Sequence, residues 1–278
     1  MSPDDSKISV TDDFGQSLAF DRAPERIVSL VPSITETLIE LGAGNRVVGI
    51  TNYCIHPARA VDNIPRVGGT KGASLEKIDA LRPDLVIANR EENRRRHIDA
   101  LREKYPVYVT YPRTVEQALK LIGDLGALTR TAGKAAEITE TCKQIVASTE
   151  PAVLDSVFST ACLVWRDPWM AVGADTYISD LLGTFGFKNV FTRDDGRYPE
   201  VSLGTIAERG TDVVVLPNEP YAFAEPDRRQ IGATLAENGR RARVLVVDGS
   251  YLTWFGYRTI QGLRFLRYAK TKLLSENQ

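Results

Sequence analysis

SLEKIDALRPDLVIA, at residues 74–88, returns in outline as SLGTIAERGTDVVVL at residues 202–216. Each stretch begins with a serine suited to cap a helix, places a leucine and an isoleucine three residues apart, and reaches an aspartate just before an apolar run typical of a buried strand. The interval from serine to aspartate is the same, Ser74 to Asp84 and Ser202 to Asp212. The repeat predicts two similar α/β lobes, and a protein of two lobes usually binds its ligand in the cleft between them.

The same alternation of strand and helix patterns covers the first half of the chain. A loose alternation at 8–22 predicts an edge hairpin, and Ser33 with Glu36 fits the capping box of a helix that follows a strand. Buried-type strands are expected at 26–31, 46–50, 84–88 and 107–111, and helices at 32–41, 74–82, 92–104 and 114–128.

After residue 155 the pattern restarts. Strands are expected at 161–164, 213–216 and 243–247, and helices at 175–185, 227–238 and 256–273 besides the repeated one. Residues 186–191 echo residues 42–47, with a glycine and an asparagine three residues apart in both. Residues 132–148 carry apolar side chains at helical spacing, and no Gly/Ser-rich or Pro-rich linker separates the halves, so a rigid helix is expected to join the lobes. The predicted fold class is α/β with mainly parallel sheets, and the domains are placed at 1–130, 131–150 (the bridging helix) and 151–278.

Bulk composition limits the kind of partner. The chain has 278 residues, 43% of them hydrophobic and 26% charged, with a net charge of −1, so no global field favours nucleic acid or an anionic membrane. No apolar run approaches the roughly 18–20 residues that cross a bilayer. The three cysteines, an odd number without metal-type spacing, are expected to be free buried thiols: Cys54, Cys142 and Cys162.

The first residues decide the expected compartment. Met1–Lys7 is polar and acidic and shows no basic region, apolar region or cleavage site of a signal peptide. The sequence as written therefore predicts a cytoplasmic protein, with a periplasmic location as the alternative if a leader has been removed.

All three tryptophans fall in two loops of the second half, where strands are expected to end. One loop contains Trp165, Arg166 and Trp169, and the other, Tyr251–Arg258, contains Tyr251, Trp254 and Arg258. Ligands of doubly wound sheets bind at the loops beyond the carboxyl ends of the strands. Indoles in such loops would suit a large flat ligand, held by stacking on its faces and by arginine at its polar rim, although packing under their own lobe is the other reading.

Catalytic motifs are missing from the sequence. It has no Gly-x-Ser-x-Gly elbow, and the glycines of 68–72 lack the spacing of either nucleotide-binding motif. His97 lies among arginines and is expected at the surface, whereas His56, in a first-lobe loop, is the better candidate for a binding site. Two scattered histidines do not make a transition-metal site. The sequence favours a binding protein over an enzyme.

An ordered set of motifs in the first half carries a family resemblance. It comprises RIVSLVPSITE at 26–36, VGITNY at 48–53 with Pro57, Val67–Gly69 and the first repeat at 74–88. The chain, over residues 8–273, resembles the substrate-binding proteins of ATP-binding-cassette (ABC) importers for cobalamin, haem and iron siderophores, and most closely the cobalamin branch. The resemblance implies two Rossmann-like lobes joined by one long helix, the helical-backbone metal receptor type of periplasmic binding protein.

The resemblance also implies roles for particular residues. Tyr53 matches an aromatic residue that contacts the corrinoid, Arg258 matches an arginine at the rim of the second lobe, and Trp165–Trp169 lies in a ligand-facing loop. Aromatic residues of the cobalamin binders align with Thr70 and Asn89. Family members dock to the permease through one glutamate on each lobe: Glu76 occupies the first position, Gly204 the second, and Glu200 lies a few residues away.

The leading hypothesis is a non-catalytic, monomeric receptor for a metal chelate, with a corrinoid first and haem or a ferric siderophore second. Because the metal would arrive inside its chelator, no built-in cofactor or protein metal site is expected, although His56 or a tyrosine could supply one axial bond. One alternative is a cytosolic cofactor-handling protein or enzyme derived from the same fold and not coupled to a transporter. A third is an interaction module without a small ligand.

Overall fold

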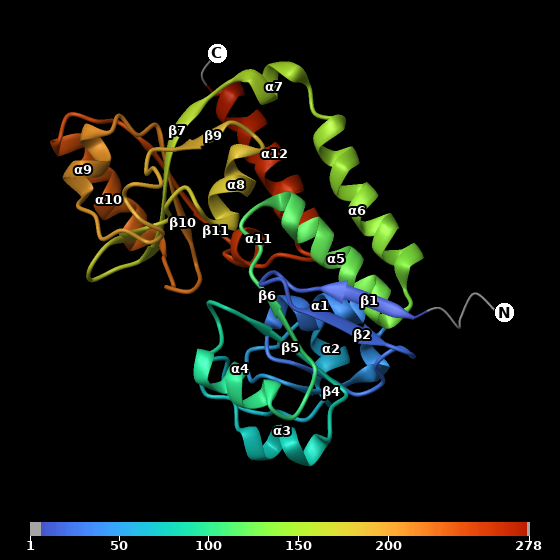
Figure 1. Ribbon diagram of the computed structural model, residues 1–278. Coiled ribbons are helices and arrows are strands. Elements are labelled where there is room, and N and C mark those ends of the chain that lie inside the picture. Colours follow the sequence, from blue (N-terminus) through green and yellow to red (C-terminus); the bar gives the residue numbers. More distant parts are fainter. Residues whose placement is uncertain (1–6, 277–278) are drawn as a thin grey trace. The chain divides into compact units, whose positions relative to one another are not determined.

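The computed structural model describes residues 7–276, which form two compact units (Figure 1). The first unit contains the chain up to Pro112 together with Glu116–Glu140. The second contains Arg113–Val115 together with the chain from Thr141 onward. Helix α6 (Ala132–Ala147) carries the chain from one unit to the other, in the segment where a bridging helix was predicted.

The first unit is built on a four-stranded parallel sheet in the order β4-β3-β5-β6. Its strands are β3 (Ile27–Ser29), β4 (Val47–Ile50), β5 (Leu85–Asn89) and β6 (Val107–Thr110). Its helical elements are α1 (Pro32–Glu40), η2 (Gly44–Arg46), α2 (Ala58–Val61), α3 (Leu75–Leu81), α4 (Arg95–Arg102) and α5 (Val115–Thr129). A separate antiparallel hairpin, β1 (Ile8–Thr11) and β2 (Ser17–Phe20), confirms the prediction for residues 8–22.

The second unit has a five-stranded sheet in which β11, β10 and β7 are adjacent and β8 and β9 pair with opposite ends of β7. Its strands are β7 (Phe158–Trp165), β8 (Met170–Ala171), β9 (Phe187–Asn189), β10 (Val213–Pro217) and β11 (Arg243–Val247). Its helices are α7 (Pro151–Asp155), α8 (Tyr177–Gly183), α9 (Leu203–Glu208), α10 (Glu225–Glu237), α11 (Ser250–Thr253) and α12 (Thr259–Ser275). All strand pairs are parallel except β7 with β8, which the sequence did not indicate.

The two sheets share one connectivity. In the first unit, β3 pairs with β4 on one side and with β5 on the other, and β6 lies at the edge next to β5. In the second, β7 pairs with β9 on one side and with β10 on the other, and β11 lies at the edge next to β10. The repeated helices α3 and α9 lead into β5 and β10. Thus β7, β9, β10 and β11 occupy the places of β3, β4, β5 and β6. The predicted α/β class with mainly parallel sheets is confirmed.

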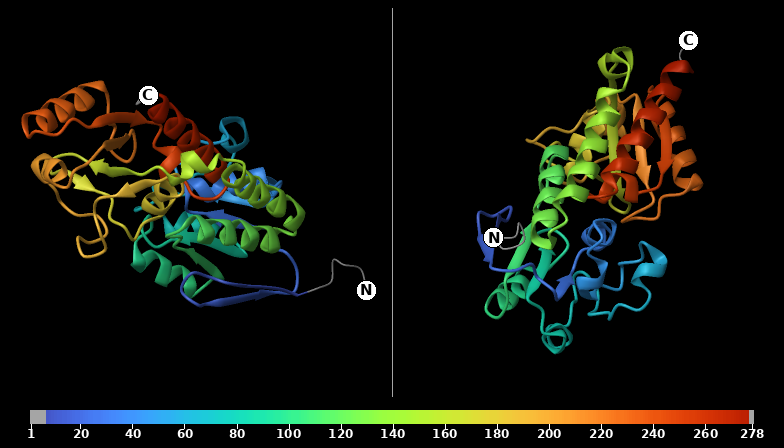
Figure 2. Two further views of the ribbon diagram at one scale, coloured as in Figure 1. Left: turned by 90° about the horizontal axis from the view of Figure 1, so that it is seen from above. Right: turned by 90° about the vertical axis from the view of Figure 1, so that its right-hand side faces the viewer.

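Alternating residues of the strands build the core on both faces of each sheet. In the second unit, α9 and α10 pack together on one face, and α8 and α12 lie on the other (Figures 1 and 2). Ile206 and Ile231 of the first pair cluster with Val214 of β10, and all three are fully buried. Such fully buried runs are typical of parallel sheets with both faces covered.

Both repeated serines cap their helices as predicted. The hydroxyl of Ser74 accepts a hydrogen bond from the Lys77 amide, and that of Ser202 accepts one from the Thr205 amide. The capping box predicted for Ser33 is wrong: α1 begins at Pro32, with Val31 at the N-cap position. Proline fits the first helical position because its missing N–H would be unsatisfied there in any case, and this starts the helix before the serine.

The prediction of free buried thiols is confirmed, since all three cysteines are buried and unpaired. Burial raises the pKa of Cys142 and of Cys162 to about 12, so both are protonated and inert at neutral pH.

Candidate functional site

Four aromatic rings meet at the carboxyl end of the second unit's sheet. Trp165 contacts Tyr221 edge-on with ring centres 5.7 Å apart, and Tyr221 lies 4.7 Å from Phe223. Trp169 stacks on Phe223 nearly parallel, at 6.2 Å. Phe223 is buried, whereas Trp165 is 43% exposed. These residues (Trp165, Trp169, Tyr221 and Phe223), called the four-ring cluster below, therefore present an exposed indole on a buried aromatic base.

The β7–β8 hairpin contains two members of the four-ring cluster, Trp165 and Trp169, and is held by Arg166. Arg166 lies over the ring of Trp169 and donates hydrogen bonds to Asp227 and Gln230 of α10. Asp227 also accepts a hydrogen bond from the Ala224 amide at the start of the same helix. The charge of Arg166 is thus engaged by a carboxylate of its own unit, and the hydrogen bond to Asp227 raises the pKa of the guanidinium further.

A second group lies around α11, after β11. The guanidinium of Arg258 lies over the ring of Trp254 at 4.9 Å and donates to the hydroxyl of Ser250 at 2.7 Å. That hydroxyl in turn donates to Asp248. The ring of Tyr251 rests against Phe265 of α12. Trp254, Arg258 and Tyr251 are therefore all partly exposed and held in place by neighbours.

The loops after β10 and β11 are tied to one another. The side chain of Asn218 accepts a hydrogen bond from the Gly249 amide, and Thr253 donates to the carboxylate of Glu219. A Cβ at Gly249 would lie 2.8 Å from the amide nitrogen of Glu219, so only glycine allows this approach. These bonds make the carboxyl end of the sheet a pre-organised surface.

Tyr53 projects from a rigid loop of the first unit. Its side chain is 63% exposed, whereas the adjacent Cys54 is fully buried. Arg66 donates hydrogen bonds to the carbonyls of Thr51 and Cys54 and so fixes the loop. His56, in the same loop, is partly buried.

Asn89 has a structural role in the loop after β5. It is 3% exposed, its amide donates to the carbonyl and the hydroxyl of Thr110, and its oxygen accepts from the amides of Glu91 and Glu92. Asn93 completes the loop by donating to the Thr70 carbonyl. Asn89, which the family resemblance aligns with an aromatic residue of the cobalamin binders, therefore organises the backbone here.

Arg90 marks a further aromatic group in the first unit. Its guanidinium lies 5.4 Å from the ring centre of Phe14 and 5.3 Å from that of Tyr111, two rings that stack on each other. Sequence reasoning missed this group because Phe14 lies in the hairpin turn, far along the chain from its partners. It likewise did not name Tyr221 or Phe223 as contact residues, although their place after a strand is a usable signal.

The predicted docking residues lie on corresponding helices. Glu76 is exposed in the first turn of α3. Gly204 takes the same place in α9, where a Cβ would meet nothing closer than 3.5 Å. Glu200 is exposed just before that helix.

Within residues 7–276, no group of three or more histidine, cysteine, aspartate or glutamate side chains could hold a metal ion. In the same range, no helix has both the length and the apolar character to span a membrane. Burial lowers the pKa of His97, on α4, so this histidine is neutral at pH 7.

A family model described as periplasmic binding protein matches residues 27–230, which is most of the chain. The chain therefore belongs to the periplasmic binding protein family, whose members are binding proteins.

Individual relatives agree with this assignment. The chain is 26% identical, over 93% of its own length and 84% of the relative's, to an uncharacterized ABC transporter substrate-binding lipoprotein, YvrC, of Bacillus subtilis. It is 27% identical to the vitamin B12-binding protein of Yersinia pestis over 70% of each chain.

Solved structures share the fold. The periplasmic vitamin B12-binding protein BtuF of Vibrio cholerae matches with a TM-score of 0.74 and 20% identity, covering 92% of this chain and 99% of that one. The periplasmic haem-binding protein RhuT of Roseiflexus matches with a TM-score of 0.70 and 22% identity, covering 88% and 97%.

These relatives correct the predicted compartment. The cytoplasmic expectation is wrong, because the relatives are periplasmic proteins or lipoproteins of importers, which work outside the cytoplasmic membrane. The expectation rested on the composition of Met1–Lys7, which says nothing about where the folded lobes bind their ligand.

Proposed function

We propose that this protein is the substrate-binding component of an ABC importer and captures a large metal chelate, with a corrinoid as the first candidate and haem or a ferric siderophore as the second. Membership of the periplasmic binding protein family and the ABC transporter relatives support the importer role. The vitamin B12-binding relatives favour the corrinoid. The observation that carries the proposal is the four-ring cluster, with its exposed Trp165.

Stacking explains how such a surface would bind a chelate. Trp165 and Trp254 offer indole faces to a flat macrocycle, and aromatic contacts add about 0.5–1.5 kcal/mol each beyond the area they bury. Arg258, beside Trp254, offers a cation to carboxylate or amide groups at the ligand rim. Tyr251 and the exposed Tyr53 complete the proposed contact set.

Two of the predicted contact residues take a supporting role in this proposal. Trp169 stacks on buried Phe223 within the four-ring cluster, and Arg166 is bound to Asp227. Both set the position of Trp165, at the end of the strand that leads into their turn. The protein binds and does not transform the chelate, and its metal arrives inside the ligand, so no resident cofactor is needed.

Calorimetric titration of the purified protein tests the proposal. Cobalamin, cobinamide, haem and a ferric hydroxamate are titrated separately, and at least one is expected to bind with micromolar or tighter affinity. Trp165→Ala should weaken that binding roughly tenfold, because it removes the exposed stacking face. Tyr268→Ala, which removes an even more exposed aromatic ring from α12, is the control and should leave the affinity unchanged. Binding weaker than about 1 mM for all four ligands would refute the chelate proposal.

The docking contact with the permease belongs to the same proposal. Glu76 presents a carboxylate at the surface of α3, and Glu200 is the nearest exposed carboxylate before α9. In this proposal Glu76 supplies the docking charge of the first unit, and the second unit, with Gly204 at the matching place, supplies the smaller contribution.

A further inference from the structure

The edge strand β11 of the second unit leaves one side of its backbone open. It pairs with β10 alone among the described strands. The Arg243 amide donates to Asp212, and the Val247 carbonyl accepts from Asn218, so alternate residues of β11 face β10. The residues between them, Val244 and Val246, direct their amide and carbonyl groups outward. Val246 is 38% exposed.

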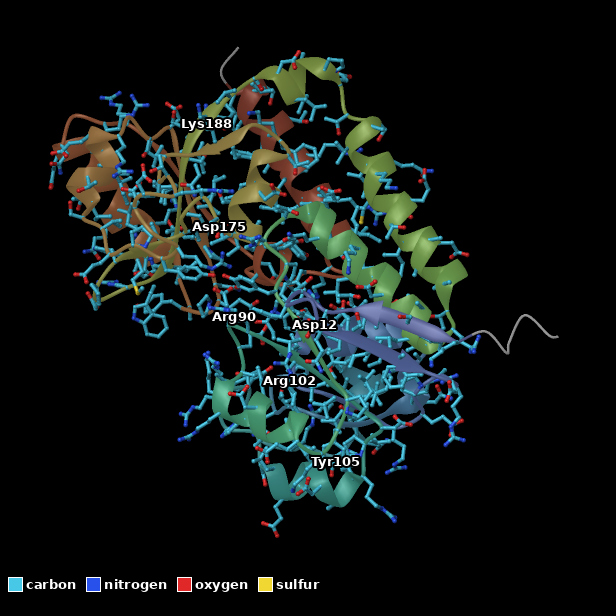
Figure 3. All side chains as sticks on the ribbon, in the orientation of Figure 1. Asp12, Arg90, Arg102, Tyr105, Asp175 and Lys188 are labelled. Carbon is cyan, nitrogen blue, oxygen red and sulfur yellow. The ribbon has the colours of Figure 1, made fainter. Side chains whose placement is uncertain are left out.

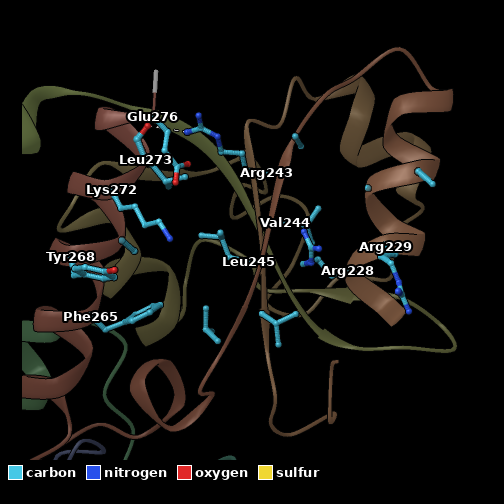
Figure 4. A pocket seen from close by; sticks show the side chains of 16 residues that line it. Arg228, Arg229, Arg243, Val244, Leu245, Phe265, Tyr268, Lys272, Leu273 and Glu276 are labelled. Carbon is cyan, nitrogen blue, oxygen red and sulfur yellow. Dashed lines mark hydrogen bonds between the residues drawn. The ribbon is translucent and has the colours of Figure 1, made fainter. Parts of the chain in front are cut away.

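A cavity of about 620 Å³ runs along this open edge. It lies between α10 on one side and α12 on the other, with β11 at its base (Figure 4). The space between two helices that flank a sheet is where a further strand would continue that sheet.

The walls of this cavity, called the β11 groove below, are rich in cations. Arg228 and Arg229 extend from α10, Arg243 from the strand and Lys272 from α12, whereas Glu276 is the only acidic side chain that residues 7–276 contribute to the lining. Arg228 is paired with Glu225, and Arg243 donates to the Leu273 carbonyl. Arg229 and Lys272 are exposed. The groove therefore complements a negatively charged chain.

The first unit shows what occupies the corresponding edge. Thr110 of β6 accepts a hydrogen bond from the Arg90 amide, just after β5, and Val247 of β11 accepts one from the Asn218 amide, just after β10. Val109 and Val246, the residues before them, therefore hold matching places in their strands. The Val109 amide donates to the carboxylate of Asp12, and its carbonyl accepts from the Asp13 amide, both at 3.3 Å. Val109 is 3% exposed. An acidic segment of the chain thus covers this edge.

Cations from the two flanking helices hold that acidic segment. Arg102 of α4, the helix before the edge strand, forms an ion pair with Asp12 at 3.1 Å (Figure 3). Lys120 of α5, the helix after it, donates to the Thr11 carbonyl. In the second unit, α10 and α12 hold the same places and carry Arg229 and Lys272, but among residues 7–276 no aspartate pair lies along β11.

We propose that the β11 groove binds an extended acidic peptide segment of a partner protein, which adds a strand to β11 as Asp12 and Asp13 cover β6. The outward amide and carbonyl of Val246 pair with the peptide backbone. Arg229 and Lys272 pair with its carboxylates. This surface lies apart from the four-ring cluster, and the inference does not depend on which ligand the protein imports.

A labelled peptide with the sequence of Ser9–Gln16, SVTDDFGQ, serves as the probe because it contains the segment that covers β6. Fluorescence anisotropy with the full-length protein should show saturable binding. Amide chemical shifts should change at Val244 and Val246. The peptide SVTNNFGQ keeps the shape and loses both charges. It should bind at least roughly tenfold more weakly, since charge-assisted pairs are lost.

Variants of the protein locate the site. Val246→Pro removes the outward amide and should abolish binding, while an edge strand tolerates proline where the amide faces solvent. The double variant Arg229→Glu and Lys272→Glu should weaken binding as strongly as the uncharged peptide does. Arg95→Glu, at an exposed position of α4, makes the same type of charge change elsewhere and should have no effect.

Three results would overturn the proposal. They are equal binding of the two peptides, shift changes confined to Val109 and its neighbours in place of β11, and self-association through β11 that Val246→Pro abolishes. The last result would make a second copy of this chain the occupant.

Discussion

The two units have the same connectivity and treat their edge strands in opposite ways. In the first, Asp12 and Asp13 cover the edge of β6, and Val109 is buried. In the second, the matching Val246 remains exposed, and the groove beside it is lined by cationic side chains of α10 and α12. Sheet order and helix placement are therefore repeated between the units, whereas the protection of an edge depends on segments outside the repeat, here the β1–β2 hairpin.

Hydrogen exchange should display this contrast most strongly. The Val109 amide is buried and bonded to a carboxylate, so it should exchange only on unfolding of its unit. The Val246 amide should exchange orders of magnitude faster, a difference of several kcal/mol in opening free energy. Residue-resolved exchange at neutral pH measures both. Equal protection of the two amides would show that some part of the chain covers β11.

Removing the cover of β6 should have the next largest effect. Asp12 is buried and accepts hydrogen bonds from Arg102 and from the Val109 and Phe14 amides. Asp12→Ala leaves these donors without an acceptor and should lower the free energy of unfolding of the first unit by about 3 kcal/mol. Denaturation followed by circular dichroism measures the loss. Asp21→Ala, at an exposed and weakly paired site, should change stability by less than about 0.5 kcal/mol.

Helices α5 and α12, which follow the edge strands, differ in the burial of a lysine, and this predicts that the stability of the fold depends on pH. Whereas Lys120 of α5 lies near the surface, Lys270 of α12 is fully buried, where it donates to the Ser156 carbonyl and lies 4.3 Å from the ring centre of Phe158. Burial lowers the pKa of Lys270 to about 8. Between pH 8 and its ordinary pKa of 10.5, the unfolded state therefore binds more protons than the folded state.

The contribution of Lys270 should accordingly make the fold more stable as the pH rises from 8 to 10, by at most about 1.4 kcal/mol per pH unit. Lys270→Met removes this contribution, and the difference in unfolding free energy between the two proteins isolates it from other titrating groups. A difference that stays constant over this range would mean that Lys270 remains charged in the folded protein.

The smallest predicted effect concerns Glu76 and Gly204, which take the same place in the repeated helices and differ in charge. Gly204 has room for a side chain, so Gly204→Glu should fold normally and strengthen docking to the permease by a factor of about two to five, typical of an exposed ion pair. Glu76→Ala should weaken docking similarly. The affinity of the reconstituted permease for each variant measures both effects. Tighter binding after loss of Glu76 would contradict the docking role.

The sequence predicted the sheets well because their signals are local. The apolar run after each repeated aspartate and the capping serines Ser74 and Ser202 depend on neighbouring residues only. Strand β8 was missed because a two-residue strand has no periodicity, and the start of α1 was misplaced because proline outweighed Ser33.

The site was less predictable because it depends on contacts between distant residues. The tryptophans could be recognised as loop residues from the sequence. Only the fold shows that Trp169 stacks on Phe223 and that Arg166 is paired with Asp227, 61 positions away. Asp12 and Asp13 look like ordinary turn residues, and their role appears only when β6 is placed beside them. Asn89 similarly becomes structural through Thr110, on the neighbouring strand.

The placement of all three tryptophans in the second unit has a spectroscopic consequence. Their emission reports on that unit alone, because the aromatic residues of the first are tyrosines and phenylalanines. Thermal unfolding followed by tryptophan emission therefore reports selectively on the surroundings of the four-ring cluster and α11. The same band would be quenched by a coloured macrocycle resting on the indoles, so occupancy can be read without a label.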